Sequence, residues 1–203
     1  MHRTKPKVKK KAKAKSWLGW HFAEENECLW YGDGKKIIVG KSHSVDCEPV
    51  FCESGLHASK TVLEALQYAS GPILYRVRLS GKIVHGDDQS CATKRSYIAK
   101  INADSLLREF GRKCALRVID LWNCPRVVKD YLETSDETLR AVAGNAGWAV
   151  ARAVAGDAAW VAATAAAGDA GLAAAWVAAR AAQSKMLDSM VFAAMKKHKT
   201  KRR

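Results

Sequence analysis

The chain has 203 residues, of which 48% are hydrophobic, and a formal net charge of +14. This length excludes a large multidomain protein, and the hydrophobic content excludes global disorder because the chain can bury a core. The positive charge lies at the two ends: residues 1–15 carry eight cations and residues 196–203 carry six, with no acid in either segment. The chain between them has 20 bases and 20 acids. This neutral body does not have the composition of a basic nucleic-acid-reading domain.

Both ends, residues 1–15 and 196–203, are predicted to be disordered basic tails. Clustered cations bind a polyanion of any base sequence because they release its condensed counterions. We therefore expect nonspecific nucleic-acid binding, although such ends could also serve only as solubility devices or spacers. No recognition helix or aromatic stacking motif indicates sequence-specific reading. The expected contacts are Lys5, Lys7, Lys9, Lys10, Lys11, Lys13, Lys15, Lys196, Lys197, Lys199, Lys201, Arg202 and Arg203.

The sequence contains no predicted membrane span or secretion signal. No charge-free stretch in the apolar C-terminal half reaches the roughly 20 residues that a spanning helix needs. Residues 16–23 are too short to be the apolar region of a signal peptide. Six cysteines without such a signal are expected to be reduced thiols. These features together predict a cytoplasmic protein.

Residues 17–103 are predicted to form a small mixed α/β domain. In its clearest strand, 73–79, one face is Ile, Tyr, Val and Leu, and the other carries two arginines. Gly71-Pro72 opens this strand and Ser80-Gly81 closes it. Before it, the capping-box pattern from Thr61 to Glu64 predicts the start of a short helix. Further strands are predicted at 16–23, 36–39, 49–52, 82–84 and 92–101.

From Asp104 onward the pattern is helical. Asp104 or Ser105 is expected to cap a helix through Phe110, with Gly111 as a possible interruption before a continuation over 114–122. A helix over 126–132 follows Pro125, and a second capping box at 134–137 precedes one over 139–143. A longer closing helix is predicted over 173–195.

A 12-residue repeat occupies residues 140–183. The sequence RAVAG at 140–144 recurs at 152–156 and, as TAAAG, at 164–168, and Trp148, Trp160 and Leu172 each lie four residues after a Gly. Twelve residues make about 3.3 helical turns, so one continuous helix would rotate equivalent positions by about 120° per repeat. A restart at each Gly-Asn or Gly-Asp would keep the large residues in register. Short stacked helices are therefore favoured, with a single long Ala-rich helix as the alternative.

The predicted fold class is accordingly α+β. A small mixed β-rich domain over 17–103 precedes an Ala-rich helical array over 104–195, and basic tails flank both. The four tryptophans of the helical half are expected to be core residues, because aromatic residues at helical spacing usually are. They are Trp122, Trp148, Trp160 and Trp176.

Four possible zinc ligands lie within 15 residues: His43, Cys47, Cys52 and His57. The residue types suit zinc, but the spacing matches no compact knuckle of the Cys-x2-Cys kind. Buried thiols and two histidines at polar sites are the favoured interpretation, so no metal is predicted.

Three features resemble an uncharacterised domain of tailed-phage and prophage proteins. They are the sequence CESGLHA at 52–58, the Ser80-Gly81 that follows a strand, and the acidic turn at 85–88. Ala/Trp-rich repeats like those at 141–183 accompany that domain. The resemblance covers residues 17–183 and implies a phage-type origin, hence the cytoplasm of a bacterial host, but no activity.

A second resemblance is to small ADP-ribosyltransferases of the rifampin-modifying type. These enzymes place a His on the first strand, an aromatic residue before an Ala-rich helix and an acid after a later strand; His21, His57 and Asp87 or Asp88 fall in that order here. The resemblance implies that His21 binds the ribose of NAD, His57 lies against nicotinamide and the carboxylate stabilises an oxocarbenium-like ribose. His57 stands where the family has Tyr, and Phe22 stands where it has Gly. The alternative is a structural His57 beside a solvated acidic loop.

Two hypotheses of different classes result. The favoured one is a non-enzymatic phage-type accessory protein, without a cofactor, that binds nucleic acid through its tails and a protein partner through its body. The alternative is an NAD-dependent ADP-ribosyltransferase-like enzyme in residues 17–103. A structure in which His21, His57 and Asp87 or Asp88 converge on one cleft would favour the enzyme. The oligomeric state is left open by the sequence.

Overall fold

The computed structural model describes residues 16–30, 34–51, 53–117, 119–121, 124–145 and 169–200. The chain has a mixed α+β fold and divides into two compact units, Met1–Ile101 and Asn102–Arg203. Within the described residues, no helix has both the length and the apolar character needed to cross a membrane.

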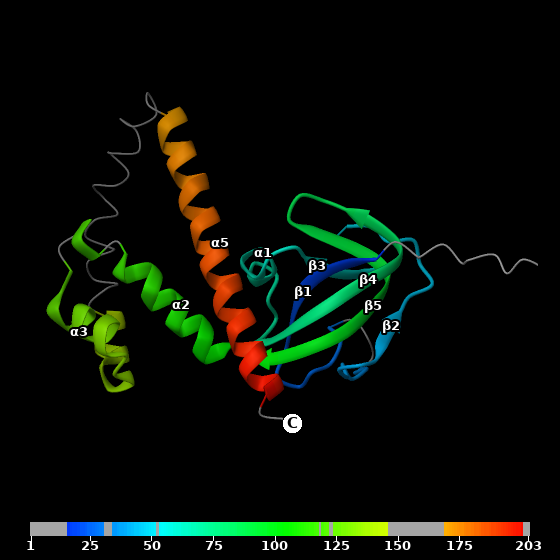
Figure 1. The fold of residues 1–203 in the computed structure, drawn as a ribbon, viewed down its shortest axis with the longest axis horizontal. Coiled ribbons are helices and arrows are strands. Elements are labelled where there is room, and N and C mark those ends of the chain that lie inside the picture. The colour runs from blue at the N-terminus through cyan, green and yellow to red at the C-terminus, as the bar shows by residue number, and fades with distance from the viewer. Residues whose placement is uncertain are drawn as a thin grey trace, which may run out of the picture. The chain divides into compact units, whose positions relative to one another are not determined.

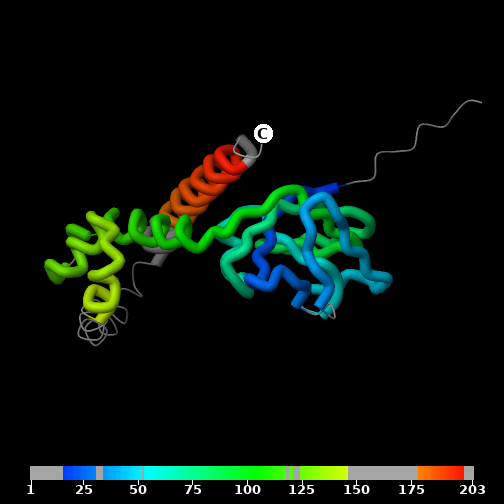
Figure 2. The backbone as a smooth tube through the Cα atoms, turned by 90° about the horizontal axis from the view of Figure 1, so that it is seen from below, coloured from blue at the N-terminus to red at the C-terminus, as the bar shows by residue number. Residues whose placement is uncertain are grey.

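The first unit is built on a five-stranded antiparallel sheet (Figure 1). Strand β1 pairs with β3 and β4, and β5 pairs with β2, β3 and β4. Strands β1, β3, β5 and β4 therefore form a closed, barrel-like ring, with β2 added beside β5; Figure 2 shows the same backbone turned by 90°. The strands are β1 (Trp17–Ala23), β2 (Ser42–Ser44), β3 (Leu56–Ser59), β4 (Ile73–His85) and β5 (Gln89–Asn102).

Alternation along β4 supplies one side of the core of this unit. Tyr75, Val77 and Leu79 have no exposed surface and pack with buried residues of the neighbouring strands, including Ala58 and Tyr97. Residues two apart on a strand share a face, which explains how the predicted apolar face of 73–79 becomes the inside of the ring.

Strand β4 continues past the predicted stop at Ser80-Gly81 and includes residues 82–84, which were expected to form a separate strand. Gly81 has a φ of +81°, and a Cβ at this position would lie 2.1 Å from Thr93 Oγ1. Glycine therefore bends the strand without ending it. The predicted strands at 36–39 and 49–52 are wrong: isolated bridges join Cys28 to Lys36 and Val50 to Ser54.

Helix α1 (Val62–Leu66) begins as its sequence predicts. The Thr61 hydroxyl accepts a hydrogen bond from the Glu64 amide, and the Glu64 carboxylate accepts one from the Thr61 amide. Val62 and Ala65 are buried, and α1 contacts β1 and β3. The cap thus fixes a helix directly beside these two strands.

The second unit is helical in its described residues. Its elements are α2 (Asp104–Leu116), a 3-10 turn η1 (Ile119–Leu121), α3 (Arg126–Thr134), a 3-10 turn η2 (Glu137–Leu139) and α5 (Asp169–Thr200). Helix α2 passes through Gly111 without interruption, and Ala103 precedes it without a side-chain cap. The capping box predicted at 134–137 is not formed. Instead, the Asp136 side chain accepts a hydrogen bond from the Thr138 amide and caps the start of η2.

The repeat region is described at its two ends, and residues 146–168 lie outside the described residues. Residues 140–145 are helical through Gly144 and Asn145, so the helix does not restart there as predicted. Residues 169–183 belong to the single helix α5, drawn as one coil in Figure 1. Because α5 extends to Thr200, residues 196–200 are helical and not part of a disordered tail. Alanine and lysine both favour helix, which explains this continuation.

Candidate functional site

A small open pocket lies where β1 and β3 run beside each other. Trp20 of β1 is paired with Ser59 of β3. Because the strands are antiparallel, His21 and Phe22, which follow Trp20 on β1, lie beside Ala58 and His57, which precede Ser59 on β3. The pocket has a volume of about 20 Å³, room for a single water molecule, and is open to solvent. Its lining residues are Trp20, His21, Phe22, His57, Ala58, Ser59, Ala65, Tyr68 and Gln89.

The pocket brings together two of the four predicted catalytic residues. His21 and His57 both line it, although they are 36 residues apart in the chain. Asp88 is joined to it through Tyr68, whose hydroxyl donates a 2.6 Å hydrogen bond to Asp88 Oδ2. Asp87 is exposed in the turn between β4 and β5 and does not line the pocket. Neither acid lines the pocket, and Asp88 is the one hydrogen-bonded to a lining residue, Tyr68.

One nitrogen of the His57 ring, Nε2, is buried and has no hydrogen-bond partner among the described residues. Gly55, two residues earlier, has a φ of +107°, a conformation in which glycine is strongly preferred. This residue type therefore sets the path of the chain into β3.

Arg95 of β5 lies buried behind the two histidines. It is 3% exposed, its Nη1 donates to the His57 main-chain carbonyl at 2.6 Å, and its Nε donates to the Tyr97 hydroxyl at 3.1 Å. The guanidinium also lies over the Tyr97 ring, 5.3 Å from its centroid. No ion pair joins Arg95 to an acid among the described residues. Because an arginine stays protonated, a buried positive charge stands next to the pocket.

This environment favours neutral imidazoles. Burial lowers the pKa of His21 well below its usual value of 6.5, and the charge of Arg95 and the neighbouring His57 lower it further. Burial and Arg95 also lower the pKa of His57, although the hydrogen bond to Gly55 partly opposes this. The charged form of each ring loses its hydration and is repelled by a guanidinium. At neutral pH both rings can therefore serve as hydrogen-bonding groups without charge.

A polar network continues from Arg95 through the inside of the ring of strands. The Tyr97 hydroxyl lies 3.1 Å from His43 Nδ1, and the Tyr97 ring meets the Tyr75 ring edge-on at 5.4 Å. The Tyr75 hydroxyl in turn donates to the carboxylate of Glu27, which Lys100 also contacts. The pKa of Glu27 is lowered by these two hydrogen bonds, while burial and Glu27 raise the pKa of Tyr75.

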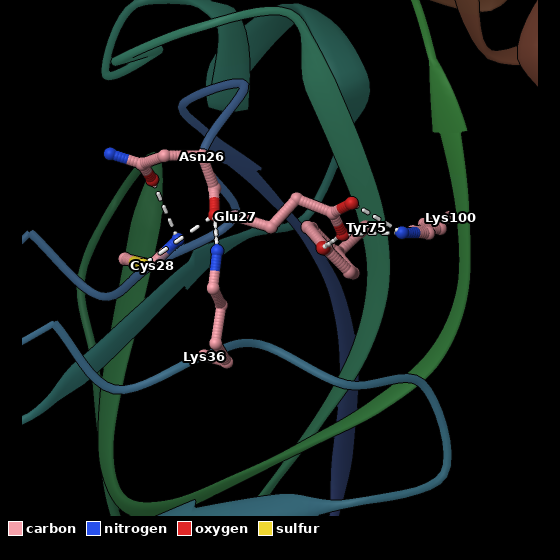
Figure 3. A network of polar contacts seen from close by, with 6 residues as sticks. All are labelled: Asn26, Glu27, Cys28, Lys36, Tyr75 and Lys100. Carbon is pink, nitrogen blue, oxygen red and sulfur yellow. Dashed lines mark hydrogen bonds and ion pairs between the residues drawn. The ribbon is translucent and has the colours of Figure 1, made fainter.

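The turn that presents Glu27 is itself held by polar contacts (Figure 3). Glu27 has a φ of +55°, a left-handed conformation that is uncommon for a residue with a side chain. The Asn26 side chain accepts from the Cys28 amide at 2.8 Å, and Lys36 Nζ donates to the Asn26 carbonyl at 2.7 Å. These bonds aim the Glu27 carboxylate at Tyr75 and Lys100.

The wall of the pocket formed by β1 is aromatic. Trp20 and Phe22 are each 1% exposed, and Arg76 lies over the Trp20 ring at 4.6 Å from its centroid. Phe22, which stands where the ADP-ribosyltransferases have Gly, thus narrows the pocket as a buried wall residue. The pocket accordingly has flat apolar surfaces beside a few polar groups.

Sequence reasoning missed three residues of this site: Tyr68, Gln89 and Arg95. Gln89 directly follows the predicted acidic turn, which is a local signal for its position. Arg95 is one of several cations in 94–100, and no local signal indicates that it is the buried one. Only the closure of the strands brings it behind His57.

The other candidate sites of the sequence are only partly described. Among the described residues no group of three or more His, Cys, Asp or Glu side chains could hold a metal ion, and Cys52 lies outside those residues. His43 contacts Tyr97, and Cys47 is exposed, so the expectation that Cys47 is a buried thiol is wrong. Of the expected nucleic-acid contacts, those at 5–15 and 201–203 lie outside the described residues, while Lys196, Lys197 and Lys199 belong to α5. Trp122, Trp148 and Trp160 also lie outside them.

Comparison with models of protein families, with curated proteins and with solved structures gave no match.

Proposed function

We propose that the first unit is an NAD-dependent ADP-ribosyltransferase-like domain. The observation that supports this proposal is the meeting of His21, His57 and, through Tyr68, Asp88 at one pocket. These are the residues to which the resemblance assigns the ribose contact, the nicotinamide contact and the carboxylate. Convergence from β1, β3 and the β4–β5 turn is the arrangement that separates a catalytic site from scattered polar residues.

The size of the pocket limits what it can hold. Its volume of about 20 Å³ is room for a single water molecule and far below the roughly 300–1,000 Å³ that is typical of pockets for drug-sized ligands. A ring of NAD would therefore enter only if the side chains that line the pocket moved apart. The buried, unpartnered Nε2 of His57 is consistent with a polar ligand group at this position.

The proposed reaction breaks the bond between the ribose anomeric carbon and nicotinamide, which leaves with the bonding electron pair as a neutral molecule. A nucleophilic oxygen or nitrogen of the acceptor forms the new bond to that carbon and releases its proton. The Asp88 carboxylate would stabilise the positive charge that develops on the ribose. The neutral His21 would hydrogen-bond a ribose hydroxyl in both the bound substrate and the transition state.

The proposal is tested with labelled NAD and an extract that supplies protein and nucleic-acid acceptors. The wild-type chain is expected to transfer label or hydrolyse NAD. Asp88→Asn should lower turnover about 10²–10³-fold with NAD affinity almost unchanged, because the charge acts mainly in the transition state. His21→Ala should instead weaken NAD binding.

Asp87→Asn is the matched control, because Asp87 is the neighbouring exposed acid, whereas Asp88 is hydrogen-bonded to the lining residue Tyr68. It should leave turnover nearly unchanged. Absence of both transfer and hydrolysis by the wild-type chain, with NAD binding undetectable by calorimetry, would contradict the proposal.

A second candidate function is favoured by the distribution of charge. We propose nonspecific association with nucleic acid through the basic ends, because fourteen cations are concentrated there and the rest of the chain is neutral. A phage-type accessory protein that also binds a protein partner through its body would use this contact for localisation. The two proposals concern different parts of the chain and are compatible.

A further inference from the structure

We propose that Cys28 and Lys36 form a modification site, at which the Cys28 thiol takes an acyl group from an acyl thioester and passes it to the Lys36 amine. The two residues lie on the segments that hold Glu27, and neither lines the pocket between β1 and β3. The proposal is therefore independent of the function proposed above. It rests on the geometry of the pair and on the accessibility of both side chains.

Cys28 and Lys36 lie directly opposite each other on two antiparallel segments. Two backbone hydrogen bonds flank the pair, from Leu29 to Lys35 at 2.9 Å and from Ile37 to Glu27 at 2.7 Å. This is the pattern of a non-hydrogen-bonded pair, in which the Cα atoms are about 4.5 Å apart and the side chains are closer than in the alternate, hydrogen-bonded pairs. The thiol and the amine therefore start from neighbouring positions on one face.

The two side chains also converge on one oxygen atom (Figure 3). The Cys28 thiol donates to the Asn26 carbonyl at 3.5 Å, and Lys36 Nζ donates to the same oxygen at 2.7 Å. Because both atoms contact one oxygen, rotation about the bonds of the lysine side chain can bring them together. Lys36 is exposed and Cys28 is partly exposed, so a reagent in solution reaches both.

The proposed modification consists of two acyl exchanges. In the first, the Cys28 thiolate attacks the carbonyl carbon of the donor thioester, forms a new thioester and expels the donor thiolate, which takes up the proton that Cys28 lost. In the second, the neutral Lys36 amine attacks the acyl carbon on Cys28, the carbon–sulfur bond breaks, and a proton of the amine passes to the departing sulfur. The products are an amide on Lys36 and a free Cys28 thiol, and no oxidant or reductant takes part.

The pair has an advantage over a lysine alone because its second step is intramolecular. Two groups held together react as if at a concentration far above that of free reactants. An exposed lysine without a cysteine opposite it must react with the donor directly. Lys35 provides this reference, because it is adjacent to Lys36 in the chain and exposed but is not paired with Cys28.

Acylation of Lys36 would change the contacts that hold Glu27. The lowered pKa of Glu27 comes mainly from the hydrogen bonds of Lys100 and Tyr75, and the positive charge of Lys36 adds to it. Acylation removes this charge and leaves a single N–H for the Asn26 carbonyl. The modification would therefore weaken the support of this turn.

The test is incubation of the full chain with acetyl-coenzyme A at mildly alkaline pH, followed by peptide mass spectrometry. Lys36 should be acetylated at least about tenfold faster than Lys35. Cys28→Ser keeps a group that can donate to Asn26 but removes the thiol, so Lys36 should then react no faster than Lys35. Cys47→Ser is the matched control, because Cys47 is exposed and lies outside the pair; it should leave the Lys36 rate unchanged.

Two further measurements separate the thiol-dependent route from a change in structure. Lys36→Arg keeps the positive charge but does not accept the acyl group, so the acetyl group should remain on Cys28 as a thioester that neutral hydroxylamine cleaves. The N-hydroxysuccinimide ester of acetic acid acylates amines without a thiol, so it should label Lys36 equally in the wild type and in Cys28→Ser. If this ester distinguishes the two proteins, the thioester in Lys36→Arg decides.

Equal acetylation of Lys36 by acetyl-coenzyme A in the wild type and in Cys28→Ser would overturn the proposal. Absence of a thioester on Cys28 in Lys36→Arg would do the same.

Discussion

At the scale of single residues, a buried positive charge organises the polar side chains of the first unit. Arg95 is joined to the His57 carbonyl and Tyr97, and its charge lowers the pKa of three histidines, His21, His43 and His57. Burial is the larger cause of each shift. In the unfolded chain the histidines have their ordinary pKa near 6.5, so the unfolded chain binds protons at a higher pH than the folded chain does.

This difference predicts that the protein loses stability in mild acid. Above pH 7 both states have neutral histidines, so these groups contribute nothing to the pH dependence. As the pH falls below about 6.5 the unfolded chain binds protons that folded His21 and His57 do not, and the free energy of unfolding decreases. Each fully neutral histidine contributes at most about 1.4 kcal/mol per pH unit. Urea denaturation at pH 7.5, 6.5 and 5.5 measures the slope.

His21→Gln removes the histidine with the most strongly lowered pKa, so this variant should show a shallower slope over the same range. A free energy of unfolding that is constant from pH 7.5 to 5.5 in the wild type would show that these rings are not held neutral. The lowered pKa of Glu27 adds a further loss of stability only at more acidic pH, below its ordinary value of 4.5.

The carboxylate of Glu27 is partly exposed, but we expect it to stabilise the fold because it contacts both Tyr75 and Lys100. Glu27→Ala leaves the Tyr75 hydroxyl and Lys100 without their acceptor, so it should lower the free energy of unfolding by about 1–3 kcal/mol. Glu27→Gln keeps an acceptor for Tyr75 and should cost less. Alanine and glutamate both carry a Cβ, so the positive φ affects them alike. Glu25→Ala, at an exposed neighbouring position, should change stability by less than about 0.5 kcal/mol. Equal effects of Glu27→Ala and Glu25→Ala in thermal or urea unfolding would contradict this.

At the scale of elements, the bend in β4 depends on Gly81. Gly81→Ala would place a Cβ 2.1 Å from Thr93 Oγ1 in a backbone with a φ of +81°, and it should destabilise the unit by about 1–3 kcal/mol or more. Gly40→Ala is the matched control, because Gly40 has a similar φ of +89° but nothing within 4 Å of its added Cβ. The loss of stability in Gly40→Ala measures the cost of the positive φ alone, without a steric contact.

The part of the Gly81→Ala effect that comes from the contact with Thr93 should be relieved in the double variant Gly81→Ala, Thr93→Ala. Non-additivity in urea denaturation measures this coupling. If Gly81→Ala and Gly40→Ala cost the same, the close approach of the two strands does not contribute.

Elements set by local chemistry were predictable from the sequence, and elements set by distant contacts were not. The capping box at Thr61 and the alternation in 73–79 were predicted because each depends on neighbours within a few residues. The continuation of β4 through Gly81 depends on Thr93 across the hairpin, and glycine was therefore interpreted as a stop. The unpaired Nε2 of His57 and the burial of Arg95 likewise require the closed ring of strands.

At the scale of the whole molecule, the basic ends predict how nucleic-acid binding responds to salt. With about 6–10 phosphates neutralised, log K plotted against log salt concentration should have a slope of roughly −5 to −9 for duplex DNA. Deleting residues 1–15 and 201–203 and changing Lys196, Lys197 and Lys199 to Gln should abolish most of the binding. Substitution is used at 196–199 because these residues are helical. Fluorescence anisotropy across a salt series measures both quantities.

Lys41, Lys60 and Lys94 are exposed cations of the neutral body and provide the control. Changing these three to Gln should leave affinity and slope nearly unchanged. Undiminished binding by the chain without its basic ends would place the contact on the body.

The closed ring of strands also bears on self-association. An open sheet presents two rows of unpaired backbone groups, which are templates for aggregation. Strands β1, β3, β5 and β4 each pair with at least two other strands, whereas β2 pairs with β5 alone among the described strands, and the pairing of β4 with β1 ends at Leu79. Strand β2 has three residues, and the end of β4 is bent and carries Lys82. Short, kinked and charged edges resist the addition of another strand, so this unit is protected against fibre-like growth by the same closure that assembles its pocket.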